Sequence, residues 1–541
     1  MSRRKRPRLE PPPAKRWAFD TEDDSKGRVY WINFFDGEQH YSFDKQERAI
    51  EWILEQRGDF WAVNLEYDLV NVFSALLDQV SVLTYGGFGL LKASLYGKPV
   101  KFYNTLRHWP LSVEEMGDRL GYPKLPFEPT NLEYCRRDTE ITWRFVGEML
   151  KRYQELGMEE IGATLPSTAL KFFLAKFCPV NHQRHPSLEL WNKLTTSRYG
   201  GRCEVFFTRP VERPVHEYDI NSSYPYAMAT QDFPNLDTMR ENGGSPDWGK
   251  AGMAHATVKA PDIEYPILPF KDPSSRKLLF PIGRFTGSWN YPELRLAMEY
   301  GYQIEKVHWF IQYEPMPSPF RDYIHFLYAK RKDVKGKDEL MSYTLKIAMN
   351  STFGKFGEEG ELQVISQGKR YVMNQVPRHS NMIWASYILA YGRIALYRYM
   401  MQAEQKGHVL YVDTDSVFVR ANSRPFGEGS SELGELAYKG TYHYTHFKLP
   451  KLYRCDTHYK AKGVPLDKRS ADTERLKREF FYDGVAEFLK PYRFLEAKKL
   501  KETANVWREC FKQRQSDYDK RIIRPDGSTW PLSIPLESGL A

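Results

Sequence analysis

Carboxylates stand at the ends of apolar strands in two segments of the chain. Asp413 and Asp415 occupy a tight turn between two β-forming runs, HVLYV and SVFVR, and Asp219 ends an apolar strand predicted at residues 216–220. A carboxylate at the end of a buried strand is costly unless it is paired or bound to a metal. If the two turns faced each other, Asp219 and Asp413 could bind two divalent cations, and oxygen ligands suit Mg²⁺. An ordinary polar hairpin would also explain the DTD turn alone.

A third segment, KIAMNSTFGKFG, is predicted to be helical and to present cations beside an aromatic ring. Lys346, Asn350, Phe353 and Gly354 follow one another at i, i+4, i+7 and i+8, so they share one helix face. Such a face can hold a triphosphate and stack on a base. A basic helix in solvent would explain the lysines upstream of it. That alternative suits Lys346 poorly, because this residue lies in an otherwise apolar stretch.

The order DINSSYP, KIAMNSTFG, YVDTDS resembles motifs A, B and C of the family B DNA polymerases, usually written DxxSLYP, KxxxNSxYG and YxDTDS. The resemblance implies that Asp219 and Asp413 bind two catalytic Mg²⁺ ions, for which Mn²⁺ could substitute, and that Asp415 lies at the same site. The implied reaction is attack of a primer 3′-hydroxyl on the α-phosphate of a deoxynucleoside triphosphate (dNTP), with release of pyrophosphate.

The same resemblance implies a nucleotide site. Lys346 would bind the incoming triphosphate with Asn350 at the same site, and Tyr224 would pack under the sugar and exclude a 2′-hydroxyl. The chain departs from the usual motifs at Ser223, where the family has Leu, and at Phe353, where it has Tyr. The ring that stacks on the nascent base pair is therefore kept, and its hydroxyl is lost.

Lysines downstream of these motifs are predicted to hold DNA. KLY, from Lys451 to Tyr453, resembles the family's KxY motif near the primer terminus, and Lys460 and Lys462 follow in HYKAKG. Basic side chains that touch phosphate fix the register of DNA without reading its sequence. We therefore expect a primer–template to lie along this segment.

The N-terminal part carries a second acidic group. Asp20 and Glu22 stand at i and i+2 in FDTED, so they point to the same face of a predicted strand. YCRRD places Tyr134 and Asp138 at i and i+4 on one face of a predicted helix, and NLEYD contributes Asp68. Four carboxylates and a tyrosine could bind two metal ions and orient a water for phosphodiester hydrolysis. Each piece alone is common.

These acidic segments, N-terminal to a polymerase, resemble the three motifs of a 3′–5′ proofreading exonuclease. The resemblance implies that four carboxylates bind Mg²⁺, namely Asp20, Glu22, Asp68 and Asp138, and that Tyr134 orients the nucleophile. Contacts with DNA are implied for residues of NLEYD and of two loose motifs, TLRHW and KLPF: Asn64, Tyr67, Thr105, Leu106 and Lys124.

One branch of the family, the protein-primed one, is indicated by two features. Tyr199, Gly200 and Gly201 resemble its YxGG/A motif, where glycines would let backbone approach DNA closely. Residues 228–314 resemble its first terminal-protein insertion; in that branch a hydroxyl of a separate terminal protein replaces the RNA primer. The shorter stretch from Lys355 to about Ser380 is predicted to form one hairpin around ISQGKR.

The fold expected is multidomain, with α/β and α+β parts: an RNase H-like exonuclease domain and a right-hand polymerase with palm, fingers and thumb. Alternating strands and helices predict the exonuclease domain at 17–165, and the polymerase domain follows at 166–541. Within it we expect the palm at about 166–227 and 344–480, the insertion at about 228–314, the fingers at about 315–354 and the thumb at about 481–541.

Composition indicates the class of protein and the cellular compartment that suits it. Of the 541 residues 41% are hydrophobic and 27% charged, so the chain can bury a large core. Residues 1–16 hold seven basic side chains and little apolar content, which predicts a disordered tail. The tail resembles a nuclear import signal, and a non-specific DNA-binding arm or a solubilising tail would also explain it. Five scattered cysteines suit a reducing compartment. No membrane span or signal peptide is expected. The location would be nuclear in a eukaryotic host and cytoplasmic otherwise.

Function hypotheses of different classes remain open at this point. The first is a protein-primed, proofreading DNA polymerase of a virus or linear plasmid that uses primer–template and single-stranded DNA, dNTPs and a terminal protein. The second is a family B polymerase primed by nucleic acid, in which the insertion only grips DNA. The third is a decayed polymerase that acts only as a DNA-binding protein.

Overall fold

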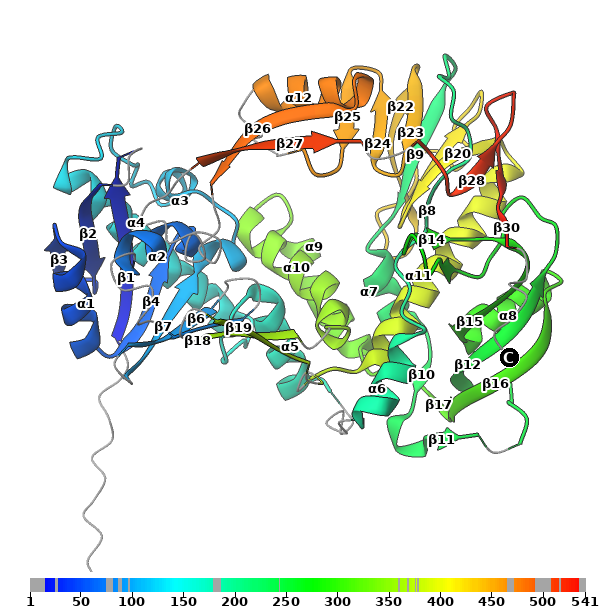
Figure 1. Ribbon diagram of the computed structural model, residues 1–541, viewed down its shortest axis with the longest axis horizontal. Coiled ribbons are helices and arrows are strands. Elements are labelled where there is room, and N and C mark those ends of the chain that lie inside the picture. The colour runs from blue at the N-terminus through cyan, green and yellow to red at the C-terminus, as the bar shows by residue number, and fades with distance from the viewer. Residues whose placement is uncertain are drawn as a thin grey trace, which may run out of the picture.

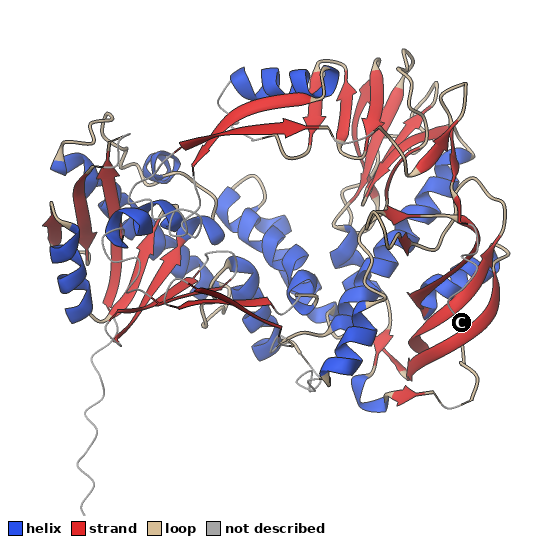
Figure 2. Cartoon of the chain, viewed as in Figure 1, coloured by secondary structure: helices blue, strands red, loops and turns tan. Residues whose placement is uncertain are grey.

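The computed structural model describes residues 15–24, 28–73, 81–85, 90–95, 98–178, 186–242, 244–358, 361–366, 369–374, 376, 379–464, 471–491, 507–514 and 517–534. A large sheet lies at one end of the molecule and smaller sheets at the other, with helices between them (Figures 1 and 2). Within the described residues no helix combines the length and apolar character needed to cross a membrane.

The N-terminal sheet has nine strands in the order β19-β18-β5-β6-β7-β4-β1-β2-β3. Its strands are β1 (Lys15–Asp23), β2 (Val29–Phe35), β3 (His40–Phe43), β4 (Gly58–Ala62), β5 (Ser81–Tyr85), β6 (Leu90–Leu95), β7 (Lys98–Asn104), β18 (Glu361–Ser366) and β19 (Lys369–Asn374). The helices of this region are α1 (Gln46–Glu55), α2 (Leu65–Phe73), α3 (Val113–Arg119) and α4 (Leu132–Glu155), with the short helix η2 (Thr105–Arg107). An apolar core that includes the rings of Trp17, Phe19 and Phe34 packs between this sheet and helices α1 and α2.

Two parts of this sheet differ from or extend the expectations. Strand β1 begins at Lys15, two residues inside the predicted tail, because Lys15 pairs with Gly58 and the guanidinium of Arg16 stacks on the ring of Trp143 at 4.1 Å. The remainder of the predicted tail, 1–14, lies outside the described residues. The hairpin expected around ISQGKR is confirmed as β18–β19, and it adds to the sheet through β5.

The central sheet is antiparallel, in the order β22-β9-β21-β20-β8. Its strands are β8 (Cys203–Val205), β9 (Val215–Ile220), β20 (His408–Asp413), β21 (Ser416–Arg420) and β22 (Leu436–Tyr442). The apolar runs of β20 and β21 are buried as strands, which confirms the expected acidic hairpin. Two helices pack on this sheet or beside it, α7 (Ser223–Thr230) and α11 (Met382–Glu404), and a small sheet follows with β23 (Thr445–Leu449), β24 (Leu452–Cys455) and β25 (His458–Ala461).

The predicted insertion supplies four strands of an outer sheet in the order β11-β16-β12-β15-β30, and β30 comes from the C-terminal segment. Its strands are β11 (Arg240–Glu241), β12 (Ala251–Ala260), β15 (Ile282–Asn290), β16 (Gln303–Tyr313) and β30 (Ser533–Ile534), and α8 (Tyr291–Glu299) follows β15. Shorter elements complete this part: β10 (Phe233–Pro234), η3 (Leu236–Thr238), β13 (Phe270–Lys271), β14 (Leu278–Leu279) and β17 (Pro315–Met316).

The C-terminal segment, where the sequence predicts the thumb from about residue 481, has described elements in two places. Helix α12 (Ala471–Tyr482) and the hairpin of β26 (Val485–Pro491) and β27 (Trp507–Gln513) extend along the top of the view toward the N-terminal sheet (Figure 1). Strands β28 (Arg521–Ile523), β29 (Thr529–Pro531) and β30 instead return to the central and outer sheets. Buried polar contacts hold them there: Tyr518 accepts from the amide of Val205 at 3.0 Å, and Arg521 donates to the carbonyl of Glu264 at 2.8 Å.

A helical pair lies between the two ends of the molecule, α9 (Arg321–Val334) and α10 (Glu339–Phe356). Helix α10 begins at an N-cap, Asp338, whose carboxylate accepts from the amide of Met341 at 3.0 Å. It packs against α5 (Leu165–Lys176), and α6 (Leu188–Thr195) packs on α11. The largest apolar core joins α4, α5, α9, α10 and α11, so it includes side chains of both halves of the chain.

Candidate active sites

The strand ends of the central sheet bring three carboxylates together. Ser416, the first residue of β21, stands opposite Asp219 of β9 on one side and Asp413 of β20 on the other. The hydroxyl of Ser416 donates to Asp219 Oδ1 at 2.9 Å. Asp415 precedes Ser416 in the turn, and its carbonyl accepts from the amide of Ile220 at 2.8 Å. The register therefore places the carboxylates of the DINSSYP and YVDTDS segments at one edge.

The turn that carries Asp413 and Asp415 depends on the Tyr199–Gly201 segment. Thr414, at the tip, has a φ of +66° and donates its amide to the carbonyl of Arg202 at 2.7 Å. A Cβ on Gly201 would lie 2.8 Å from Thr414 Cγ2, so only glycine permits this approach. The close backbone approach at Gly201 thus serves the acidic turn, whereas nothing lies within 4 Å of a Cβ at Gly200.

A buried arginine of α11 binds the backbone of the same segment. Arg393 donates to the carbonyl of Tyr199 at 2.6 Å and to that of Gly200 at 3.0 Å. It also pairs with Glu293 of α8 at 2.8 Å, and both side chains are almost fully buried. Breaking a buried pair by removing one partner is strongly destabilising. The outer sheet and the segment beside the acidic turn are therefore tied to one helix.

Lysines occupy the acidic edge. The ammonium of Lys451 donates to Asp413 Oδ1 at 2.6 Å and Oδ2 at 2.9 Å, and Lys439 Nζ lies 3.5 Å from Asp219 Oδ2. Burial raises the pKa of Asp415 to about 7, and the charges of Asp219 and Asp413 add to that rise. A site that raises the pKa of one carboxyl and draws two ammonium groups has the negative charge to bind divalent cations.

Sequence reasoning placed Lys451 near DNA and missed Lys439. The structure puts Lys451 directly on Asp413, while the ring of its neighbour Tyr453 packs 5.3 Å from that of Tyr411. Lys460 of β25 and Lys462 just after it are exposed. A lysine on β22 could have been found only by knowing that β22 pairs with β9, since no local motif marks it.

The nucleotide-site residues of the sequence analysis meet between α7, α10 and α11. The rings of Tyr224 and Phe353 have centroids 4.5 Å apart, and burial raises the pKa of Tyr224 to about 12. A Cβ on Gly392 of α11 would lie 2.7 Å from Tyr224 Cε1, so this glycine makes room for the ring. Gly392 was missed, although an isolated glycine inside an apolar helix is a costly residue that indicates a packing role.

Helix α10 presents the rest of that face. Lys346 is exposed, and Asn350 is half-buried and donates to the carbonyl of Lys346 at 2.7 Å. The opposite face is buried. Ser223, which replaces the usual leucine, buries a hydroxyl that has no hydrogen-bond partner among the residues described. Upstream on α9, Lys332 pairs with Glu432 at 2.8 Å, so it is not a free cation.

The N-terminal carboxylates also converge, from β1, α2 and α4. Burial raises the pKa of Asp20 to about 8 and that of Glu22 to about 10, and neighbouring carboxylates contribute in both cases. The pKa values of Asp68 and Asp138 are raised as well, chiefly by burial. The hydroxyl of Thr21 donates to Asp68 Oδ1 at 2.8 Å. Carboxyl groups that are buried close together are stable only when some of them are protonated or when they bind cations.

Two oxygens of this cluster have nothing to bind. Asp68 Oδ2 and Asp138 Oδ1 are buried and lack a hydrogen-bond partner within the described part of the chain. Buried polar atoms are almost always satisfied, and carboxylate oxygens are the ligands that Mg²⁺ prefers. The donor set therefore fits divalent cations at this site.

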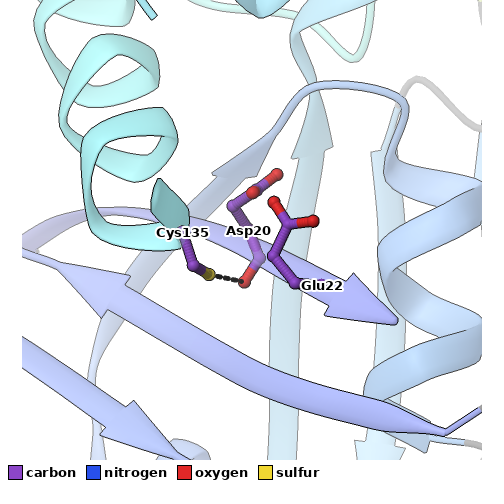
Figure 3. Close-up of side chains that lie close together, drawn as sticks. All are labelled: Asp20, Glu22 and Cys135. Carbon is purple, nitrogen blue, oxygen red and sulfur yellow. Dashed lines mark hydrogen bonds between the residues drawn. The ribbon is translucent and has the colours of Figure 1, made fainter. Parts of the chain in front are cut away.

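A buried thiol also lies beside these acids, and sequence reasoning did not find it. Figure 3 shows Cys135 of α4 next to Asp20 and Glu22, with its Sγ donating to the carbonyl of Asp20 at 3.6 Å. One ligand atom from each of the three lies within 4.8 Å of the others. Burial, with the neighbouring carboxylates, raises the pKa of the thiol well above its usual value, so it stays protonated. A neutral, soft sulfur does not suit Mg²⁺.

Lys124 and Tyr134 lie beside Asp138 at the edge of this acidic cluster. The ammonium of Lys124 donates to Asp138 and lies 4.6 Å from the ring centroid of Tyr134. Burial raises the pKa of Tyr134 to about 12. Phe127, the last residue of KLPF, meets the ring of Tyr134 edge-on at 5.8 Å and is 77% exposed, so an aromatic surface adjoins the carboxylates.

The other residues predicted to contact DNA differ in their burial and in their hydrogen bonds. Asn64 has a φ of +58°, and the Tyr67 hydroxyl donates to Asp23. Thr105 is buried and donates to the carbonyl of Ala62 at 3.1 Å, so its hydroxyl serves the fold. Leu106 is half-buried. Within TLRHW, only the middle of the segment reaches the surface.

Comparisons with known proteins find similar sequences among DNA polymerases. The family described as DNA polymerase type B, organellar and viral, matches residues 91–382. A probable DNA polymerase of Neurospora intermedia is 25% identical over 397 residues, which cover 64% of this chain and 39% of the relative. A probable DNA polymerase of Ascobolus immersus is 28% identical over 324 residues, which cover 54% of this chain and 26% of the relative. The chain thus spans well under half the length of these relatives.

A solved structure extends the likeness to nearly the whole fold. Phi29 DNA polymerase, complexed with primer-template DNA and incoming nucleotide substrates, is 16% identical, with a TM-score of 0.73 over 93% of this chain and 100% of that chain. At this identity the likeness shows the fold. It confirms the expected multidomain fold, in which mixed α/β parts and several sheets are combined.

Proposed function

The chain belongs to the type B DNA polymerases of organelles and viruses, and on that premise we propose that it is a DNA-directed DNA polymerase with a 3′–5′ proofreading exonuclease. Its substrates are primer–template DNA, single-stranded 3′ ends and dNTPs. The observation that carries the proposal is the convergence of Asp219, Asp413 and Asp415 on adjoining strand ends. The acidic cluster of the N-terminal sheet supports a separate hydrolytic site.

In the polymerase site, Asp219 and Asp413 hold two Mg²⁺ or Mn²⁺ ions. When bound, such ions stabilise the attacking and the leaving oxygen of a phosphoryl displacement. Lys346 and Asn350 of α10 bind the triphosphate, and the ring of Tyr224 excludes a ribose 2′-hydroxyl. The contact of that ring with Phe353 supports this role, because the two residues belong to different motifs yet touch.

In the exonuclease site, the cations are held by the four buried carboxylates Asp20, Glu22, Asp68 and Asp138. Tyr134 orients the attacking water, and Lys124 holds Asp138 in place. The unpartnered oxygens of Asp68 and Asp138 support this donor set. The single-stranded 3′ end is contacted by Asn64, Tyr67 and Leu106 and by Lys124, whereas the buried hydroxyl of Thr105 holds its segment to the carbonyl of Ala62.

The duplex is held on the polymerase side by main-chain and lysine contacts. The residues concerned are Tyr199, Gly200, Gly201, Lys451, Tyr453, Lys460 and Lys462. Lys451 has a double role in this proposal: it neutralises Asp413 in the protein without DNA, and it contacts the primer end when DNA binds. The short distances from Lys451 to Asp413 support the first half of that role.

Protein priming is the mode of initiation that we propose. The outer sheet built from β11 to β16 is the terminal-protein insertion, and its helix α8 reaches the Tyr199–Gly201 segment through Glu293 and Arg393. A nucleic-acid primer is the second candidate. The two are separated by incubating the polymerase and labelled dNTP with the candidate terminal protein: transfer of a nucleotide to that protein supports protein priming, and extension of oligonucleotides only excludes it.

A recessed primer–template, Mg²⁺ and labelled dNTPs test the activity itself. Extension is expected with dNTPs, and shortening of the 3′ end without them. Asp219→Asn or Asp413→Asn should abolish extension and leave shortening, whereas Asp20→Asn with Glu22→Gln should do the reverse. Loss of both activities in one folded variant would contradict two separate sites. Neither activity in a folded wild-type protein that binds DNA would leave the decayed, DNA-binding alternative.

A further inference from the structure

The nucleotide-binding helix α10 is fastened to the N-terminal domain by a buried hydrogen bond. Trp109, just after the short helix η2, donates its indole Nε1 to the hydroxyl of Thr344 at 2.7 Å. Both side chains are fully buried, at 0% exposure. Thr344 in turn donates to the carbonyl of Leu340 at 2.9 Å, so its hydroxyl both accepts and donates. No water can replace either partner where the pair is sealed from solvent.

The N-terminal end of the same helix has further contacts with the N-terminal domain. Arg152 of α4 lies 3.2 Å from the carboxylate of Asp338, the N-cap of α10. Arg119 of α3 lies 3.6 Å from Glu339, but this pair is largely exposed and contributes little. The helix is thus held at its start and, one and a half turns later, at Thr344.

The position of Thr344 relates directly to the nucleotide site. Successive residues of an α-helix are turned by about 100°, so Thr344 and Lys346 stand on nearly opposite sides of α10. Fixing Thr344 against Trp109 therefore fixes the direction in which Lys346 and Phe353 point. One turn further along the same buried face, α10 is tied to α9, because the hydroxyl of Tyr323 donates to the carbonyl of Ala348 at 3.1 Å.

We propose that Trp109, a residue of the exonuclease domain, is a positioning residue for the incoming nucleotide: its bond to Thr344 sets the rotation of α10 and so the placement of Lys346. This inference rests on the proposed polymerase function. Trp109 belongs to TLRHW, the segment whose Leu106 is proposed to contact the single-stranded end. One short segment then serves the hydrolytic site on one side and the nucleotide site on the other.

Thr344→Val and Thr344→Ser test this directly, since only serine keeps the hydroxyl. The measurement is the dissociation constant of dNTP from the protein bound to a dideoxy-terminated primer–template, so that no chemistry is needed. We expect Thr344→Val to weaken dNTP binding by about three- to tenfold, the equivalent of one hydrogen bond, and Thr344→Ser to stay within about twofold of wild type.

Trp109→Phe should reproduce the effect from the other partner, and it should add nothing to Thr344→Val in the double variant. Arg152→Gln, at a partly exposed position, gives a second route that spares the core; a smaller weakening of dNTP binding is expected. Thr139→Val is the matched control, because the buried Thr139 hydroxyl donates to the carbonyl of Cys135 in its own helix and, among the described residues, to no other group. Its dNTP affinity should equal that of wild type.

The outcomes separate this inference from the function on which it rests. If wild type binds dNTP and Thr344→Val binds it equally well, the positioning role of Trp109 is overturned and the polymerase assignment stands. If wild type binds no dNTP on primer–template, both are overturned. Full exonuclease activity with weakened dNTP binding in Thr344→Val supports the inference, because general unfolding would reduce both.

Discussion

One buried histidine in the shared apolar core should make the folded protein less stable at acidic pH. His108 is fully buried beside Tyr153, with its Nδ1 3.2 Å from the Tyr153 hydroxyl, and burial lowers its pKa to about 3. A histidine with a lowered pKa stays neutral in the folded protein but takes up a proton in the unfolded chain below about pH 6.5. The unfolded state then binds more protons, so stability is lost as the pH falls from about 6.5 toward 3.

His108→Gln should remove this dependence. At pH 5.5 the protonation of His108 in the unfolded chain costs about 1.4 kcal/mol of stability, a cost absent at pH 7.5. Urea unfolding at the two pH values measures it: the wild type should lose about that much more than His108→Gln between them. Parallel losses in the two proteins would show that His108 does not stay neutral when folded.

The residue scale also shows what local sequence can and cannot reveal. Asp219, Asp413 and the pair Asp20 and Glu22 could be predicted because strand alternation and strand ends fix where a carboxylate points. Lys439 could not, because its position beside Asp219 depends on the pairing of β22 with β9. Nor could the thiol of Cys135 be placed, since a helix periodicity does not say which strand the helix covers.

At the scale of elements, the long helix α11 has a glycine where the ring of Tyr224 needs it. Gly392→Ala would put a Cβ 2.7 Å from Tyr224 Cε1 and 3.0 Å from Cδ1. Overpacking of this kind costs about 1–3 kcal/mol. The ring would move away from α11, and its contact with Phe353 would change. We expect discrimination against ribonucleotides to fall by about tenfold, which corresponds to about 1.4 kcal/mol.

Competition between dNTPs and ribonucleotides during primer extension measures that ratio. Gly354→Ala on α10 is the stability control, because nothing lies within 4 Å of the added Cβ. It should raise the melting temperature slightly, as replacement of a glycine within a helix gains about 0.5–1 kcal/mol and Gly354 lies in the last turn of α10, whereas Gly392→Ala should lower it. An unchanged nucleotide preference in Gly392→Ala would exclude the ring of Tyr224 from sugar selection.

Helices and strands were predicted best where neighbouring residues in the sequence alone specify them. The acidic hairpin β20–β21, the strand β9 and the hairpin β18–β19 lie where apolar runs and turn residues indicated. Partners far away in the chain could not be predicted: β30 joins the outer sheet, and β18 extends the N-terminal sheet through β5. Backbone pairing over such separations leaves no periodic signal in the strands themselves, so the sequence could not indicate that the last described strand joins the outer sheet.

On the scale of the whole molecule, the two proposed activities share one core. The largest apolar cluster includes Trp109 and Phe145 of the N-terminal domain, Phe173 of α5 and Leu345 of α10. The rings of Trp109 and Phe145 lie 5.3 Å apart, and that of Phe173 lies 5.1 Å from Phe320, beside α9. The ladder between β5 and β18 adds main-chain hydrogen bonds across the same division. Units joined in this way should unfold together rather than in turn.

Leu345→Ala tests this cooperativity from the polymerase side. Leu345 is fully buried, and truncation of such a leucine costs about 2–5 kcal/mol. Since the core is shared, the temperatures at which extension and 3′ shortening are lost should fall together, and calorimetry should show one transition in both wild type and variant. If shortening survived at temperatures that abolish extension, the N-terminal domain would be stable alone. The bond between Trp109 and Thr344 would then break before the exonuclease site does.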